Sequence, residues 1–174
     1  MALVIAARYP LAMLPAIAAA LLLAPDPSPA HAALERLAGC WSAPGAVMGK
    51  TVATQVRAVW RLGGRYLLLE SHGLDPKDPY DAAIVIGDHD ATRLSGWWMD
   101  SFGAGYSAAG KGEVKDGAIL VDYAYPDALY ANRIAPEGDG WRWTIIERKP
   151  DGSEKPFAAY RLTRAACDGT PFAF

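Results

Sequence analysis

The sequence has little of several features that would point directly to a function. Only two cysteines and three histidines occur among its 174 residues, and the formal net charge is −2. Two cysteines cannot form a disulfide-rich scaffold or a four-cysteine zinc site. Acidic and basic residues are nearly balanced and form no long single-sign run, which excludes the basic surface of a nucleic-acid-binding protein. The chain is 52% hydrophobic, which is enough to bury the core of one domain.

Glycine is missing from the first 32 residues, which differ in character from the rest of the chain. Arg8 precedes an apolar run over residues 11–24, and prolines then interrupt the run before the small residues Ala30-His31-Ala32. This order is typical of a secretory signal peptide, and the run is too short for a transmembrane helix. We predict a signal peptide over residues 1–32, cleaved after Ala32, and one periplasmic or secreted domain over residues 33–174.

A second export signal overlaps the start of that domain. Leu37-Ala38-Gly39-Cys40 matches the four-residue box after which bacterial lipoproteins are cleaved and acylated on cysteine. Such a box directly follows the apolar run, whereas residues 25–36 intervene here. We therefore expect membrane contact only through the signal segment, unless Cys40 is lipidated.

Residues 33–174 have the pattern of short strands joined by tight turns. Pairs such as Gly63-Gly64 and Asp116-Gly117 suit hairpin turns because they tolerate positive φ. Between such pairs, segments such as residues 51–62 alternate between apolar and polar side chains. Ten strands are predicted, near residues 40–44, 51–62, 65–73, 80–87, 91–101, 106–114, 118–125, 128–135, 140–149 and 155–164.

Ten strands in sequence order predict an all-β fold, a ten-stranded antiparallel up-and-down β-barrel with a short N-terminal helix over residues 33–38. A closed barrel leaves no exposed strand edges. A two-layer sandwich with longer crossovers is the alternative. The uniformly short connections favour the barrel.

Two motifs carry a resemblance to known barrels. Gly39-Cys40-Trp41, after a short helix, resembles the Gly-x-Trp opening of lipocalin-like proteins, and residues 161–164 resemble the segment whose basic residue packs on that tryptophan. Residues 62–66 and 98–103 resemble an uncharacterised bacterial family of calycin-like barrels, related to lipocalins, fatty-acid-binding proteins and nitrobindins. The resemblance covers residues 33–174 and implies a barrel that holds a ligand.

The even strand count also predicts which end of the barrel is open. The turns at one rim are all tight, whereas several connections at the other rim are longer, so we expect the mouth at the second rim. The residues expected near it are His72, Tyr80, Asp100, Tyr125, Tyr130 and Glu147.

Acid–base catalysis at this mouth is one hypothesis. A histidine and a carboxylate in one cleft can transfer protons, and His72, Asp100 and Glu70 are the catalytic candidates. His72 shares a strand face with Tyr66 and Glu70, so this pair can equally point to solvent.

The aromatic residues suggest a binding pocket instead. All six tryptophans follow residue 32, and rings edged by hydroxyls are common in small-molecule pockets. Rings can also simply fill a small barrel as core. The predicted ligand-binding residues are Trp98, Tyr123, Tyr125, Trp143 and Glu147.

Haem is disfavoured, and no other cofactor or metal is expected. Some relatives of the resembled family bind haem, but no histidine follows His89. The C-terminal half therefore lacks the proximal ligand of a nitrobindin-like haem site. Asp88-His89-Asp90 lies on one turn without a second histidine nearby, which is a poor zinc site.

The cysteines are predicted to form a disulfide. Cys40 opens the first strand and Cys167 follows the tenth. In a closed barrel these chain segments are neighbours, and an oxidising compartment permits the bond.

The first hypothesis for function is an exported barrel that binds a small hydrophobic or amphipathic molecule in its interior. The alternative is a cofactor-independent enzyme, such as a lyase, isomerase or hydrolase, that uses acid–base residues at the mouth; catalysis is the less favoured of the two. A third hypothesis is an envelope protein that binds a partner through its outer wall. That protein would need a contiguous exposed apolar patch.

Overall fold

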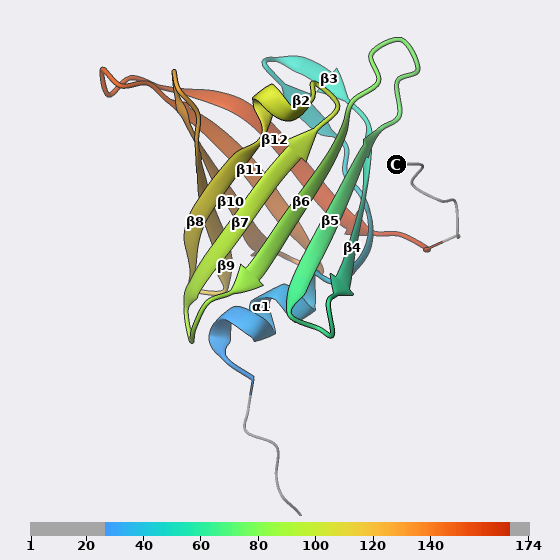
Figure 1. The fold of residues 1–174 in the computed structure, drawn as a ribbon. Helices are drawn as coiled ribbons and strands as arrows, with labels where there is room; N and C mark the ends of the chain where they lie inside the picture. The colour runs from blue at the N-terminus through green and yellow to red at the C-terminus, as the bar shows by residue number, and fades with distance from the viewer. Residues whose placement is uncertain (1–26, 168–174) are drawn as a thin grey trace, which may run out of the picture.

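The computed structural model describes residues 27–167 and forms a closed antiparallel β-barrel with one short helix at its base (Figure 1). The predicted fold class is confirmed. The elements in chain order are α1 (Pro29–Leu37), β1 (Gly39–Ser42), β2 (Gly45–Val47), β3 (Lys50–Val52), β4 (Thr54–Arg61), β5 (Tyr66–Gly73), β6 (Asp81–Asp88), β7 (Arg93–Asp100), η1 (Ala104–Tyr106), β8 (Ala108–Lys115), β9 (Ala118–Ala124), β10 (Leu129–Glu137), β11 (Gly140–Arg148) and β12 (Glu154–Arg164).

The barrel closes where its first and last strands meet. β1 pairs with β4 on one side and with β12 on the other, and β4 to β12 follow one another in sequence order. The short hairpin of β2 and β3 continues β1 and also pairs with β12. Ten strands, β1 and β4–β12, thus form the wall.

Alternation of side chains decides which residues fill the interior. On β4, Val56 and Ala58 are buried, whereas Arg61 is exposed. Their partners Ser71 and Leu69 on β5 share the inner face. Aliphatic and aromatic side chains occupy these inward positions on every wall strand, because burying them removes apolar surface from water.

Helix α1 seals one end of the barrel, called the closed end here (Figure 1). Leu34 and Leu37 are 0% exposed, because residues three and four apart share the helix face that points into the barrel. Ser28 caps the helix, accepting a hydrogen bond from the backbone N–H of His31 at 3.1 Å. The predicted cleavage site after Ala32 therefore lies within α1, and most of the predicted signal segment, residues 1–26, lies outside the described residues.

The Gly-x-Trp motif has a physical explanation at this end. The Arg164 guanidinium lies 4.0 Å above the Trp41 ring, as the resemblance implied for the last strand. Gly39 has φ +128°, and a Cβ there would lie 2.0 Å from Arg164 Nη1. The positive φ therefore favours glycine, and any larger residue would also displace the Arg164 guanidinium from Trp41.

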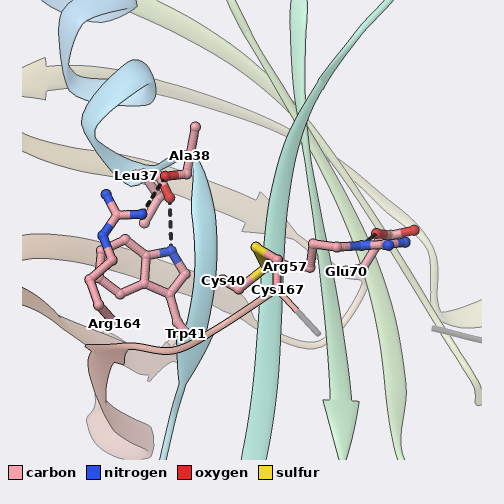
Figure 2. The surroundings of a disulfide bond; sticks show 8 residues. All are labelled: Leu37, Ala38, Cys40, Trp41, Arg57, Glu70, Arg164 and Cys167. Carbon is pink, nitrogen blue, oxygen red and sulfur yellow. Dashed lines mark hydrogen bonds and ion pairs between the residues drawn. A yellow bond between two sulfur atoms is a disulfide. The ribbon is translucent and has the colours of Figure 1, made fainter. Parts of the chain in front are cut away.

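The predicted disulfide is confirmed. Cys40 and Cys167 are bonded, with their Cα atoms 5.4 Å apart (Figure 2). A sulfur in a disulfide cannot also carry a thioether lipid. Cleavage before Cys40 would also remove α1 and open the closed end. The structure thus favours the disulfide over the lipoprotein alternative.

The opposite end, called the mouth, holds the longer connections over residues 74–80, 101–107 and 149–153 (Figure 1). The predicted orientation of the barrel agrees with this arrangement. Within residues 27–167, no helix is both long and apolar enough to cross a membrane.

Loss of the disulfide is expected to cost much of the protein's stability. The bond spans 127 residues, and closing so long a loop stabilises by about 4–5 kcal/mol in the chain-entropy model. We expect the Cys40→Ser, Cys167→Ser double variant to lose up to that much free energy of unfolding, measured by urea denaturation. Thiol titration of the unfolded, unreduced protein should detect no free thiol; two reactive thiols would contradict the pairing.

Candidate functional site

The middle of the barrel, between α1 and the mouth, is filled by its own side chains. The cavity there measures about 10 Å³, which is room for about one water molecule. A larger guest would have to displace tightly packed side chains, which is costly. The cavity is lined by Leu69, Ile84, Ile86, Trp98, Ile119, Val121, Tyr123, Asn132, Ile134 and Trp143.

The mouth half of the wall carries half-buried aromatic rings. Tyr125 and Tyr130 lie with ring centroids 5.4 Å apart, and Tyr130 contacts Phe157 at 4.9 Å. Trp143 contacts Tyr160 at 5.4 Å and Trp98 at 6.1 Å. These rings form two groups of contacting side chains that pack on the core; Trp143 is buried, and the other five rings are half-buried.

The structure gathers the predicted ligand-binding residues on the inner wall. Trp98, Tyr123, Trp143 and Glu147 all take inward positions on their strands, and Tyr125 follows β9 directly. The Trp98 ring lies 5.6 Å from that of Tyr123. Their role in binding stays a prediction.

The Tyr123 hydroxyl is a polar group buried deep in this wall. Its side chain is 2% exposed, and its hydroxyl has no hydrogen-bond partner among residues 27–167. The ring lies over Gly96 and Gly110, where an added Cβ would come within 2.7 Å of it. Burial raises the pKa of Tyr123, so the hydroxyl stays protonated and able to donate.

Asp100 ends β7 on the inner face of the mouth, and its hydrogen-bond donors within residues 27–167 are neutral groups. Trp98 Nε1 and the Tyr80 hydroxyl each donate to Oδ2 at 3.2 Å. The backbone N–H of Phe102 donates to Oδ1 at 3.0 Å. Within residues 27–167, no lysine, arginine or histidine forms an ion pair with Asp100.

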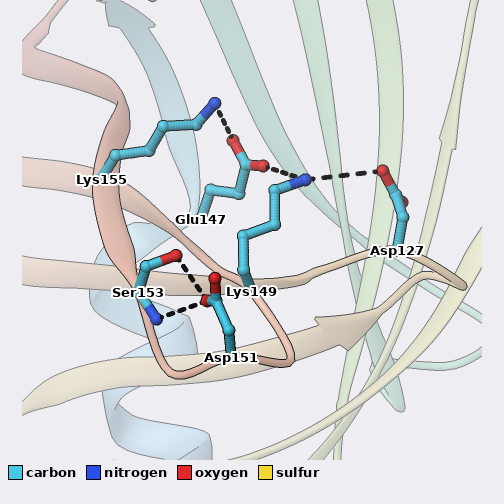
Figure 3. A network of polar contacts seen from close by, with 6 residues as sticks. All are labelled: Asp127, Glu147, Lys149, Asp151, Ser153 and Lys155. Atoms are coloured by element: carbon cyan, nitrogen blue, oxygen red, sulfur yellow. Dashed lines mark hydrogen bonds and ion pairs between the residues drawn. The ribbon is translucent and has the colours of Figure 1, made fainter.

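Glu147 is the opposite case at the same rim (Figure 3). The residue is 4% exposed, and its two carboxylate oxygens contact Lys149 at 2.7 Å and Lys155 at 3.0 Å. Lys149 also faces Asp127 at 3.6 Å. Hydrogen bonds from the two lysines lower the pKa of Glu147. The carboxylate is therefore ionised, and the two lysines balance its negative charge.

The three catalytic candidates do not converge. Glu70 and His72 lie on the outer face of β5, where Glu70 pairs with Arg57 at 2.5 Å and His72 pairs with Asp81. Asp100 alone lies inside the mouth. The acid–base hypothesis therefore lacks its assembled site.

The mouth offers no histidine for haem iron. His31 stacks on Trp60 near the closed end, His72 lies on the outer wall, and His89 is exposed in a turn. Among residues 27–167, no group of three histidine, cysteine or carboxylate side chains is placed to hold a metal ion.

The outer wall carries the apolar surface that the third hypothesis requires. A shallow groove of about 370 Å³ lies beside Trp97 and Met99, each 42% exposed. Cross-strand pairing aligns one apolar row over β4–β8, formed by Val59, Leu68, Val85, Trp97 and Ala109.

The prediction missed several mouth residues, mainly those in loops. Phe102 is 67% exposed and Tyr106 57% exposed, and both belong to the connection between β7 and β8. Two aromatic residues within a short polar loop could have indicated these positions in the sequence, because large rings are uncommon in such loops. Lys149 and Lys155 bracket one turn, which places both beside Glu147.

Comparison with known proteins identifies the fold but no family. The crystal structure of Rv2717c from Mycobacterium tuberculosis matches with a TM-score of 0.63 and 16% sequence identity, over 81% of this chain and 100% of that one. A redesigned β-barrel gives a TM-score of 0.41 and 12% identity, over 77% and 96% of the two chains. No protein-family model and no curated protein matches. The first likeness supports the barrel fold alone.

Alkaline pH should destabilise the protein through the mouth tyrosines. Burial raises the pKa of Tyr125 and of Tyr160 to about 12, whereas the unfolded chain has a tyrosine pKa of about 10. The unfolded state therefore loses these protons first, so the free energy of unfolding should fall from about pH 10 to about pH 12. Urea denaturation across this range should show a shallower fall for Tyr160→Phe; an unchanged slope would contradict the assignment.

Proposed function

We propose that this protein is an exported, calycin-like barrel that binds a small hydrophobic or amphipathic molecule at its mouth. The observation that carries the proposal is the contrast between the two ends. One end is sealed by α1 above a filled core, and the other presents half-buried rings beside hydrogen-bonding groups. Apolar walls with a few polar groups are the usual composition of a ligand site.

The filled core limits how deep the ligand goes. The mouth rings Tyr125, Tyr130 and Phe157 border solvent, so an apolar tail can pack among them with modest side-chain movement. The next layer holds Trp98 and Trp143, which line the small cavity of about 10 Å³. The binding site is therefore the upper part of the interior, and Trp98 reports on it.

Export is supported by the disulfide, because such bonds persist in oxidising compartments. The predicted signal segment gives the route. The binding hypothesis has more support than catalysis, since Asp100 is the only one of the three catalytic candidates on the inner wall.

Ligand titration followed by tryptophan fluorescence tests the proposal. We expect a saturable change with neutral amphiphiles such as an alkyl alcohol. Tyr130→Ala should weaken binding about tenfold, because a buried aromatic contact is worth about 1–2 kcal/mol.

The matched control is Tyr66→Ala. Tyr66 is also a half-buried tyrosine, but it lies on the outer wall against Trp97. Its loss should leave affinity within about twofold, as is usual for a surface change. Absence of saturable binding in the unaltered protein, or an equal loss in both variants, would refute binding at the mouth.

A further inference from the structure

Asp100 lies on the inner wall of the mouth, and among residues 27–167 it forms no ion pair with a cationic side chain. The charges of Lys149 and Lys155 are offset by Glu147 and Asp127 at the same rim (Figure 3). Asp100 instead takes hydrogen bonds from an indole, a phenol and a backbone amide. These neutral donors orient the carboxylate but leave its negative charge in place.

Two aromatic side chains contact this carboxylate, and one of them continues into a chain of contacting rings. Tyr80 donates to Asp100 and contacts the Phe102 ring at 5.5 Å; Phe102 in turn contacts Tyr106 at 5.7 Å. The Tyr125 hydroxyl donates to the backbone carbonyl of Tyr106 at 2.8 Å, which connects the inner wall to this loop. The rings of Phe102 and Tyr106 are more than half exposed.

The negative charge of Asp100 acts on two of these side chains, Tyr80 and Tyr125. Burial raises the pKa of Tyr80 and of Tyr125, and the negative charge of Asp100 raises both further. A positive charge placed between these groups would therefore meet a carboxylate and several ring faces together. Ring faces attract cations through their quadrupole, and aromatic cages hold quaternary ammonium groups in this way.

We propose that the mouth selects an organic cation, an alkylammonium-type amphiphile whose positive head lies against Asp100, Phe102 and Tyr80. The proposal rests on the proposed function and adds the head-group chemistry of the ligand. The apolar tail packs among Tyr125 and Tyr130, as any amphiphile would. An anionic head in the same place would be repelled by Asp100.

A metal cation fits this site less well than an organic one. Calcium and magnesium need several oxygen ligands, and residues 27–167 contain no cluster of three metal-binding side chains. A bulky, weakly hydrated ammonium group needs one counter-charge and apolar surroundings, which this part of the mouth supplies.

The test compares three amphiphiles with the same alkyl chain and different heads. Isothermal titration calorimetry, below the micelle concentration of each, measures binding of octyltrimethylammonium, octyl sulfate and octanol. We expect octyltrimethylammonium to bind at least about tenfold more tightly than octyl sulfate, with octanol between them. The preference should shrink as salt is added, because part of it is Coulombic.

Two variants separate Asp100 from the general effect of protein charge. Asp100→Asn should reduce the preference to about threefold or less, because it removes the counter-charge. Asp122→Asn makes the same change in net charge on the exposed outer face of β9 and should keep the preference. Phe102→Ala, at a largely exposed ring, should weaken binding of octyltrimethylammonium more than binding of octanol, and this comparison holds even if Asp100→Asn does not fold.

Each contrary outcome overturns a distinct statement. Equal binding of all three amphiphiles would leave the proposed function standing and overturn head-group selection. A preference that survives Asp100→Asn and Phe102→Ala would overturn the assignment to these residues. Binding of none of the three would overturn the proposed function itself.

Discussion

The stacking of Arg164 on Trp41 joins the first strand, the last strand and the helix at one point. The guanidinium covers the ring and donates to Ala38 O at 2.8 Å, while Trp41 Nε1 donates to Leu37 O at 2.9 Å (Figure 2). The guanidinium also donates to Arg36 O at 3.2 Å. These bonds satisfy carbonyl groups at the end of α1 that the helix leaves unpaired. They hold the helix in the barrel end and fix the β1–β12 seam, which closes the ten-stranded wall.

Because α1 seals one end of the barrel, a ligand that binds inside must enter at the mouth. The closed end is apolar and filled, whereas the mouth holds both buried charges and solvent-facing rings. Glu147 and Asp100 have different roles at the mouth. Glu147 ties together the turn between β11 and β12 through its lysines, and Asp100 supplies uncompensated charge to the ring cluster. The disulfide strengthens the same seam from the outer side and belongs to the stability of the barrel.

Much of this architecture could be predicted from the sequence, because it depends on local patterns. Alternation and turn residues set the ten strands, the mouth and the pairing of Cys40 with Cys167. The prediction placed His72 and Glu70 on one strand face but could not decide whether that face was inner or outer, since this depends on register across strands. Tyr80 reaches Asp100 from a loop, and loop conformation leaves no periodic signal. How completely side chains fill the barrel interior depends on their packing in three dimensions, which no pattern along the chain encodes.

The central claim is that ligands enter at the mouth, beside Asp100, and the tryptophans allow a direct measurement of this. Each indole N–H gives its own NMR signal: Trp98 lies at the mouth, Trp41 and Trp60 at the closed end, and Trp97 on the outer wall. An alkylammonium probe carrying a nitroxide on its head broadens nearby signals. We expect the strongest broadening at Trp98 and much weaker broadening at Trp41 and Trp60. Strongest broadening at Trp97 would contradict it and move binding to the outer wall.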